Sequence, residues 1–307
     1  MLVTVVMTTF NRLNYVSASI ASVLNQTHRD LELIIVDDHS TDGTFEVVES
    51  FARRDKRVRP VRNPENRGVA TCRNNGLSLA NSELIVCHDD DDIMLPERIE
   101  KQVQYLHDNP QLSVVSSWAI LIDHAGRVVG HSAPKVDMLK GRSRRDPTML
   151  VEIITSASMY RKKDVMQVGG FRFAHGLDDR DLWGRMITEG FQIGVQPEYL
   201  VEHRKHGNSI MVKDLDRLFE YGDYIDHNIV RRMRGQGDIS IEQYRDWQRS
   251  MSSLGRLWST RRRRSQMAFR CAVLSYGNKQ WTALARCLLE AMLLAPYPTL
   301  RRIWDKW

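Results

Sequence analysis

The chain has 307 residues, enough for one large domain or two smaller ones with a substantial hydrophobic core. It has 44 Lys and Arg against 38 Asp and Glu, which gives a net charge of +6. This charge is compatible with a basic enzyme, a nucleic-acid binder or a membrane-surface protein. The four cysteines, Cys72, Cys87, Cys271 and Cys287, form no CxxC pair, which argues against a zinc site or a disulfide framework and favours a reducing, cytoplasmic compartment.

Strands alternate with helices from the first residue to about residue 109, a pattern typical of a parallel α/β sheet. The apolar N-terminus lacks a basic start, so we expect a first strand rather than a signal peptide. The expected strands are Leu2–Met7, Leu31–Val36, Val58–Val61 and Leu84–Cys87, and the expected helices are Tyr15–Asn25, a helix that follows Ser40–Gly43 to about Arg53, Gly68–Ala80 and Pro96 to about Asp108.

Beyond Pro110 the pattern becomes mixed. We expect strands at Ser113–Ile122, Arg127–Gly130, Thr155–Met159 and Tyr199–Val201, a helical turn at Lys163–Val168 and a helix from Asp178 to Thr188. The polar, basic stretch Met138–Pro147 is either an active-site lid or a solvated loop. From about Asp214 the chain is expected to be helical, with a break at Gly235–Gly237. The apolar stretch Thr282–Leu294 contains Arg286 and Glu290, so no membrane-spanning helix is expected.

Four consecutive carboxylates, Asp89–Asp92, directly follow the strand-like run Leu84–Cys87. Such a strand delivers its carboxyl end to the edge where open α/β sheets bind ligands. Neighbouring carboxylates repel one another unless a divalent cation neutralises them, and hard oxygen ligands favour Mg2+ or Mn2+. The pattern therefore predicts a metal and diphosphate site. The alternative is a solvated acidic turn that caps the helix starting near Pro96.

Five motifs follow one another over about two thirds of the chain: Val5–Arg12, Val36–Thr44, Asn66–Gly76, Asp89–Asp92 as a DxD motif with a further acid, and Gly169–Phe171 followed by Asp178–Trp183. In this order they resemble the family 2 glycosyltransferases with the A-type nucleotide-sugar fold. One departure is Asp178, where Glu is more usual in that family.

The resemblance implies a mostly parallel central sheet flanked by helices, and a non-processive, inverting, metal-dependent transfer of a sugar. The donor would be a nucleotide-diphosphate sugar, with UDP favoured, and the acceptor a hydroxyl of a glycan or lipid-linked molecule in cell-envelope polysaccharide synthesis. It implies a catalytic domain at residues 1–212, composed of a nucleotide-binding half (1–109) and an acceptor half (110–212), followed by a helical basic region at 213–307.

The donor site is expected around the acidic turn. Asp91 is the first choice as metal ligand, and Asp89 would hold the ribose or join the metal shell. Asp90 points to the other side of the strand end, where solvation is the favoured interpretation and a nucleotide contact the alternative. Asp37 and Asp38 end the second strand, where they can accept hydrogen bonds from a nucleobase imide or ribose hydroxyls.

Further donor contacts come from three other segments. By resemblance Thr8 and Thr9 line the base pocket, and Arg12 follows the same strand. Arg73 would contact the base or the diphosphate, or else be a helix-surface arginine. His206 would complete the metal or phosphate shell, with His203 as the weaker candidate, or else each is an ordinary surface or core histidine.

The acceptor side is expected at the start of the Asp178–Thr188 helix. The resemblance makes Asp179 the general base that removes a proton from the acceptor hydroxyl, and direct displacement with one base implies inversion. Asp178 belongs to the same acceptor motif. Trp183 would form the floor of the acceptor site, although a core aromatic is the favoured alternative. Asp92 would contribute to the metal site or cap the next helix.

The C-terminal region is basic and apolar together. Its aromatic and aliphatic residues could bury an apolar face at the inner surface of the cell membrane, with arginines on anionic headgroups. The residues in question are Trp281, Leu284, Leu288, Met292, Trp304 and Trp307. The alternative is a packed helical subdomain or a homodimer interface.

Three other classes of protein compete with the glycosyltransferase. A nucleic-acid binder would gain nothing from four clustered acids, and the interleaved aromatics of an RNA-binding sheet are missing from the sequence. A nucleotidyltransferase would be expected to carry a glycine-rich basic loop where this chain has Thr8–Arg12. A catalytically silent nucleotide-binding scaffold is the third alternative, and the intact Asp91 and Asp179 argue against it.

Overall fold

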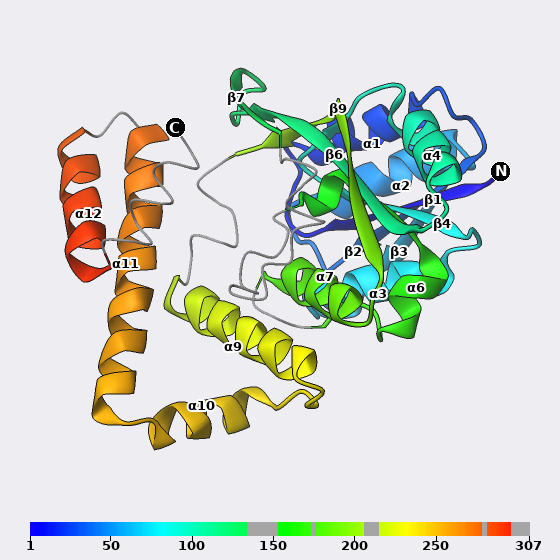
Figure 1. Ribbon diagram of the computed structural model, residues 1–307. Coiled ribbons are helices and arrows are strands. Elements are labelled where there is room, and N and C mark those ends of the chain that lie inside the picture. Colours follow the sequence, from blue (N-terminus) through cyan, green and yellow to red (C-terminus); the bar gives the residue numbers. More distant parts are fainter. Residues whose placement is uncertain (134–152, 173–175, 206–214, 278–280, 296–307) are drawn as a thin grey trace. The chain divides into compact units, whose positions relative to one another are not determined.

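Figure 1 shows the computed structural model of the protein, which describes residues 1–133, 153–172, 176–205, 215–277 and 281–295. The chain divides into two compact units. The first combines Met1–Lys213 with Ile225–Gln236, and the second combines Asp214–Tyr224 with Gly237–Trp307. The expected division of function at residue 212 stays a prediction.

The first unit carries the strands and most of the helices. Its strands are β1 (Val3–Thr9), β2 (Leu31–Asp37), β3 (Val58–Arg62), β4 (Leu84–Asp89), β5 (Ile93–Met94), β6 (Leu112–Ile122), β7 (Val128–Ser132), β8 (Met159–Arg161) and β9 (Gln192–Arg204). Its helices are α1 (Val16–Leu24), α2 (Thr44–Arg54), α3 (Val69–Leu79), α4 (Arg98–Asp108), the short 3-10 helix η1 (Thr155–Ala157), α6 (Lys162–Gln167) and α7 (Asp178–Thr188).

A single nine-stranded sheet among the described residues runs in the order β3-β2-β1-β4-β8-β6-β9-β5, with β7 beside β6. The first four strands of this order are parallel, and so are β6 and β9, whereas β8 pairs antiparallel with both β4 and β6. The predicted mostly parallel α/β fold is confirmed. Because β1 lies between β2 and β4, the carboxyl ends of these three strands meet at one edge.

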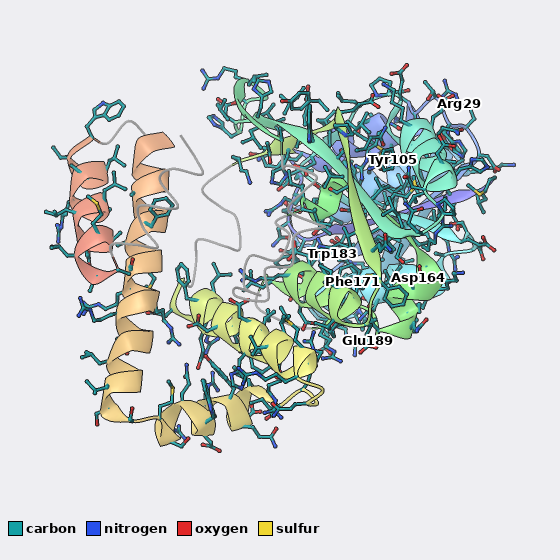
Figure 2. All side chains as sticks on the ribbon, in the orientation of Figure 1. Arg29, Tyr105, Asp164, Phe171, Trp183 and Glu189 are labelled. Carbon is teal, nitrogen blue, oxygen red and sulfur yellow. The ribbon has the colours of Figure 1, made fainter. Side chains whose placement is uncertain are left out.

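Helices cover both faces of the sheet (Figure 1). Along β1 the side chains alternate, so that Val5 and Met7 join the core beneath α1, α2 and α4, while Val6 joins the core beneath α3, α6 and α7. The apolar runs of the parallel strands are explained by this burial on both faces. The core beneath α7 includes Phe171 and Trp183, which Figure 2 labels.

Three elements differ from the sequence expectation. Thr155–Ala157 form the 3-10 helix η1, and the strand starts only at Met159. Ile93–Met94 form β5, an unpredicted antiparallel partner of β9. β9 itself runs from Gln192 to Arg204, far longer than the expected Tyr199–Val201. It pairs along most of β6, and this pairing accommodates polar residues that do not show a strand pattern in the sequence. The predicted loop at Met138–Pro147 lies outside the described residues.

The second unit is helical. It contains the first part of α9 (Leu215–Met233) and the whole of three further helices, α10 (Ile241–Ser250), α11 (Ser253–Gly277) and α12 (Trp281–Leu294). A capping box of Ser240 and Gln243 starts α10, and Arg245 donates two hydrogen bonds of 2.8 Å to the carboxylate of Glu220. No described helix has both the length and the apolar character needed to cross a bilayer.

The contact between α3 and β1 gives a test of the fold. A Cβ at Gly76 would overlap the Cγ1 methyl of Val6, which is 1% exposed. We expect Gly76→Ala to lower the free energy of unfolding by about 1–3 kcal/mol through overpacking, measured by urea denaturation. Val6→Ala removes the obstructing methyl groups, so the same glycine substitution should cost clearly less in that background. An equal cost in both backgrounds would show that the two residues are not in contact.

Candidate active site

The carboxyl ends of β1, β2 and β4 bring the expected donor residues together. Thr8 pairs in register with Asp89, and Thr9 with Asp37. Thr8 is half-buried, whereas Thr9 is 3% exposed, and its carbonyl accepts a hydrogen bond of 2.9 Å from the Asp38 N–H. Residues predicted from three separate motifs therefore share one edge of the sheet.

A buried arginine joins this edge to the start of α7. Arg73 is 7% exposed, and its guanidinium donates to Asp89 Oδ1 at 3.0 Å and to Asp178 Oδ2 at 2.6 Å. Its neighbour Asn74 exchanges two hydrogen bonds with the backbone of Phe171, at 2.7 and 2.8 Å. The alternative of a helix-surface arginine is therefore wrong. Helix α3 holds the acidic turn and both parts of the acceptor motif in place.

The acidic turn is more buried than the sequence suggested. Arg12 Nε lies 3.5 Å from Asp90 Oδ1 and 3.6 Å from Asp91 Oδ2. Asp90 is 7% exposed, so its expected solvation is wrong; the turn folds it inward beside Arg12. Burial and the neighbouring Asp91 raise the pKa of Asp90 well above its usual range, and burial raises the pKa of Asp89 to about 6 despite the contact with Arg73.

Asp92 has a different environment. Its buried carboxylate accepts hydrogen bonds from His203 Nδ1 at 2.8 Å, from the Arg204 N–H at 2.7 Å and from the Ser156 hydroxyl. Burial raises its pKa, but His203 and the other donors outweigh that effect and lower it overall. Glu97 occupies the N-cap of α4 and makes no capping hydrogen bond with its side chain, so the expected helix-capping role of Asp92 is wrong. Asp92 instead ties the acidic turn to β9 and η1.

Asp179 lies in the first turn of α7. It accepts hydrogen bonds from Thr155 Oγ1 at 2.7 Å and from the Arg180 N–H at 2.6 Å. Burial, and then the nearby Asp178, raise the pKa of Asp179, while the bond from Thr155 acts in the opposite direction. A carboxylate with a raised pKa, oriented by a hydroxyl donor, suits a general base.

Sequence reasoning missed the two hydroxyl residues of η1. Thr155 holds Asp179, and the adjacent Ser156 holds Asp92. The sequence offers only a pair of hydroxyl side chains directly after the apolar Ile153–Ile154, a pattern that predicts a strand. Placing their side chains toward two distant acids requires the 3-10 turn that the structure shows.

The carboxylates at the end of β2 organise the surrounding loops. Asp38 accepts hydrogen bonds of 2.8 Å from Asn63 Nδ2 and from the N–H groups of Arg67 and Gly68. Burial raises its pKa, but these donors lower it overall. Asp37 is fully buried and accepts a bond of 3.0 Å from the Ser40 N–H. Asp38 thus shapes the loop that leads into α3, and a contact of either acid with a nucleobase stays a prediction.

Two further candidate residues, Trp183 and His206, are not found at this edge of the sheet in the described part of the chain. Trp183 is 1% exposed and packs in the core beneath α7, with its ring centroid 6.3 Å from that of Tyr160. The favoured interpretation of a core aromatic is therefore confirmed, and the alternative of an acceptor-site floor is wrong, because α7 turns this side chain toward the sheet. His206 lies outside the described residues.

The acidic turn, Asp89–Asp92, offers a divalent cation a small number of carboxylate ligands. The side chains of Asp89 and Asp91 are 33% and 15% exposed and offer carboxylate oxygens from one turn. Among the described residues no group of three or more His, Cys, Asp or Glu is arranged as a metal site. A cation bound by one or two carboxylates and completed by substrate phosphates and water is the usual arrangement for Mg2+.

The chain is similar to known glycosyltransferases. The sequence profile described as glycosyl transferase family 2 matches residues 4–169. An uncharacterized glycosyltransferase of Methanocaldococcus jannaschii is 30% identical over 214 residues, 66% of this chain and 70% of that protein. TuaG of Bacillus subtilis, whose name assigns it to teichuronic acid biosynthesis, is 27% identical over 211 residues, 68% of this chain and 81% of that protein.

Solved structures share the fold at low sequence identity. Residues 1–349 of S. aureus TarS in complex with UDP-GlcNAc superpose with a TM-score of 0.59 and 17% identity, covering 95% of this chain and 91% of that one. The mannosyltransferase PcManGT of Pyrobaculum calidifontis, in complex with GDP-Man and Mn2+, gives a TM-score of 0.58 and 16% identity, covering 99% and 88%.

The bridge made by Arg73 can be tested through stability. Arg73→Met leaves Asp89 and Asp178 without their buried cationic partner, and we expect it to lower the free energy of unfolding by about 3–5 kcal/mol in urea denaturation. Adding Asp89→Asn and Asp178→Asn should recover part of this loss. As a matched control, Arg57→Met breaks a partly exposed pair with Asp55 and should cost no more than about 1 kcal/mol. Equal costs for the two single variants would contradict the bridge.

Proposed function

Because this chain belongs to glycosyl transferase family 2, we propose that its site transfers one sugar from a nucleotide-diphosphate donor to an acceptor hydroxyl, with inversion at the anomeric carbon. The observation that carries the proposal is the Arg73 bridge, which holds Asp89 on the donor side and Asp178, the neighbour of Asp179, on the acceptor side. A donor and an acceptor placed at these two carboxylate groups would meet in a fixed geometry.

The donor side is proposed to be the acidic turn and the strand ends around it. Asp91 would hold a Mn2+ or Mg2+ ion, and Asp89 would bind the ribose or share the ion. When bound, the ion would neutralise the charge that develops on the departing diphosphate. The nucleotide would be lined by Thr8, Thr9, Arg12, Asp37, Asp38, Arg73 and Asp90, with His206 as a further candidate for the phosphates.

The acceptor side is proposed to work through Asp179. Its carboxylate would take the proton of the acceptor hydroxyl while that oxygen attacks the anomeric carbon from the face opposite the nucleotide, so the sugar inverts. Thr155 donates to Asp179 Oδ2 at 2.7 Å and the Arg180 N–H donates to Oδ1 at 2.6 Å, and the two bonds together orient the carboxylate. Burial keeps the pKa of Asp179 above that of a solvated aspartate, and a stronger base results.

UDP is the favoured nucleotide, since TarS binds UDP-GlcNAc, and GDP is the alternative carried by PcManGT. For the acceptor we propose a glycan or lipid-linked hydroxyl in cell-envelope polysaccharide synthesis, in line with the teichuronic acid assignment of TuaG. A catalytically silent nucleotide-binding scaffold is the competing function, because Arg12 already lies beside Asp90 and Asp91.

Donor binding tests the metal role of Asp91. We expect calorimetry to show that UDP binds in the presence of Mn2+ and at least about tenfold more weakly after chelation, because Asp91 would hold an ion that offsets the charge of the diphosphate. Asp91→Ala should lose the Mn2+-dependent part of the affinity, while the exposed Asp108→Asn retains it. If UDP, dTDP and GDP all fail to bind the folded wild type with Mn2+, the donor assignment is wrong.

Acceptor activation tests Asp179. Asp179→Asn should lower kcat by at least about 100-fold without changing UDP affinity, since only the proton acceptor is lost. Turnover can be followed as UDP release, with Asp108→Asn as the matched aspartate control. Unchanged kcat in Asp179→Asn would remove it as the base. A folded wild type that binds UDP with Mn2+ yet turns over no UDP-sugar with any acceptor would support the silent scaffold.

Thr155 should set the pH dependence of the same step. Its hydrogen bond lowers the pKa of Asp179, so Thr155→Val should raise that pKa. The base is active when deprotonated, and therefore the acidic limb of the kcat profile should move to higher pH, with the plateau approached only at more alkaline pH. Thr155→Ser keeps a hydroxyl and should restore the wild-type profile. A loss of activity without a shift of the limb would assign Thr155 a structural role alone.

A further inference from the structure

The positive charge of the chain is concentrated at its C-terminal end. From Arg256 onward there are 11 Lys and Arg against 2 Asp and Glu, a net charge of +9, so the preceding residues carry −3 of the total of +6. A region of this charge attracts anionic partners strongly at physiological ionic strength. The candidate active site is not part of this region.

Helices α11 and α12 pack against each other through small residues and one phenylalanine. Ala268, Phe269 and Ala291 are buried in this contact, and Ser265 Oγ donates a hydrogen bond of 2.9 Å to the Ala291 carbonyl. Short side chains at the contact allow the two helices to approach closely. One side of α12 is thereby covered by α11.

The opposite side of α12 is apolar and exposed. Trp281, Leu289 and Leu293 are 61%, 58% and 68% exposed, and Ala285 lies between them at the same four-residue spacing. Residues at this spacing share one face of a helix. A helix with apolar residues on both its sides normally has both sides covered. We call this surface, made of Trp281, Ala285, Leu289 and Leu293, the outer face of α12.

Arginines border the outer face. Arg286 is exposed and follows Ala285 on the same helix, and the exposed Glu290, the acidic residue of α12, follows Leu289. Arg261 of α11 is exposed and donates a hydrogen bond of 3.2 Å to the carbonyl of Leu293, which places its cation at the end of the outer face. An apolar strip edged by arginines matches a bilayer surface, where acyl chains accept the strip and anionic headgroups meet the guanidinium groups.

We infer that the outer face of α12 is a docking surface for an anionic lipid bilayer. The charge distribution favours this occupant over the alternatives. A second copy of the chain docking on the same face would bring two regions of +9 together, and nucleic acid would use the arginines but leave the tryptophan and leucines in water. The inference does not depend on the proposed reaction, since it concerns another surface and its test needs no turnover.

The test is sedimentation of the full chain with vesicles of phosphatidylcholine alone and of phosphatidylcholine mixed with phosphatidylglycerol. We expect binding only to the anionic vesicles, weakened by about 0.5 M NaCl because salt screens the headgroup charge. Leu289→Ser combined with Leu293→Ser should reduce the partition coefficient by at least about tenfold, and Arg286→Gln by a smaller factor. Both leucines are exposed, so circular dichroism should show an unchanged fold.

A matched control uses exposed apolar residues of the other unit. Val128 and Val129 of β7 are each 59% exposed, and Val128→Ser combined with Val129→Ser should leave vesicle binding unchanged. The inference fails if the wild type does not sediment with anionic vesicles, or if the α12 double variant binds like the wild type. It also fails if light scattering shows a dimer that the α12 double variant dissociates, because a second copy would then cover this face.

Discussion

The arrangement of the candidate site depends on a single buried cation. The guanidinium of Arg73 lies between Asp89 and Asp178, which belong to segments about 90 residues apart in the chain. Burying a charge this deeply costs several kcal/mol unless its partners are well placed, so the ion bridge constrains the positions of both carboxylates. Asn74, on the same helix, adds two hydrogen bonds to the backbone at Phe171. The end of β4 and the start of α7 are consequently fixed relative to α3, and through α3 to each other.

The acidic turn shows how identical residues acquire different properties. Asp89 faces Arg73, Asp90 and Asp91 face Arg12, and Asp92 accepts bonds from His203, Ser156 and the Arg204 N–H. Burial raises the pKa of Asp89 and Asp90, whereas the donors around Asp92 lower its pKa. Three donors hold Asp92 as a structural carboxylate. Asp89, Asp90 and Asp91 lie beside arginines, which offset part of the repulsion among the three carboxylates.

The parallel half of the fold could be predicted because its strands and helices have strong hydrophobic periodicity, and because each strand ends in a recognisable polar motif. The candidate site followed from the same motifs, since parallel strands bring their carboxyl ends together. The burial of Asp90 could not be predicted, because it depends on how a turn packs against distant segments. The role of Thr155 and Ser156 was hidden for the same reason, as hydroxyl residues carry no periodic signal.

The 3-10 helix η1 has a consequence for how this protein can diverge. Two adjacent side chains of one short turn hold Asp179, in the first turn of α7, and Asp92, in the acidic turn. A change in the backbone of η1 therefore displaces both carboxylates at once. If these carboxylates have the roles proposed above, a substitution in η1 would alter the acceptor side and the donor side together, so differences in acceptor preference among relatives should accumulate in segments other than η1.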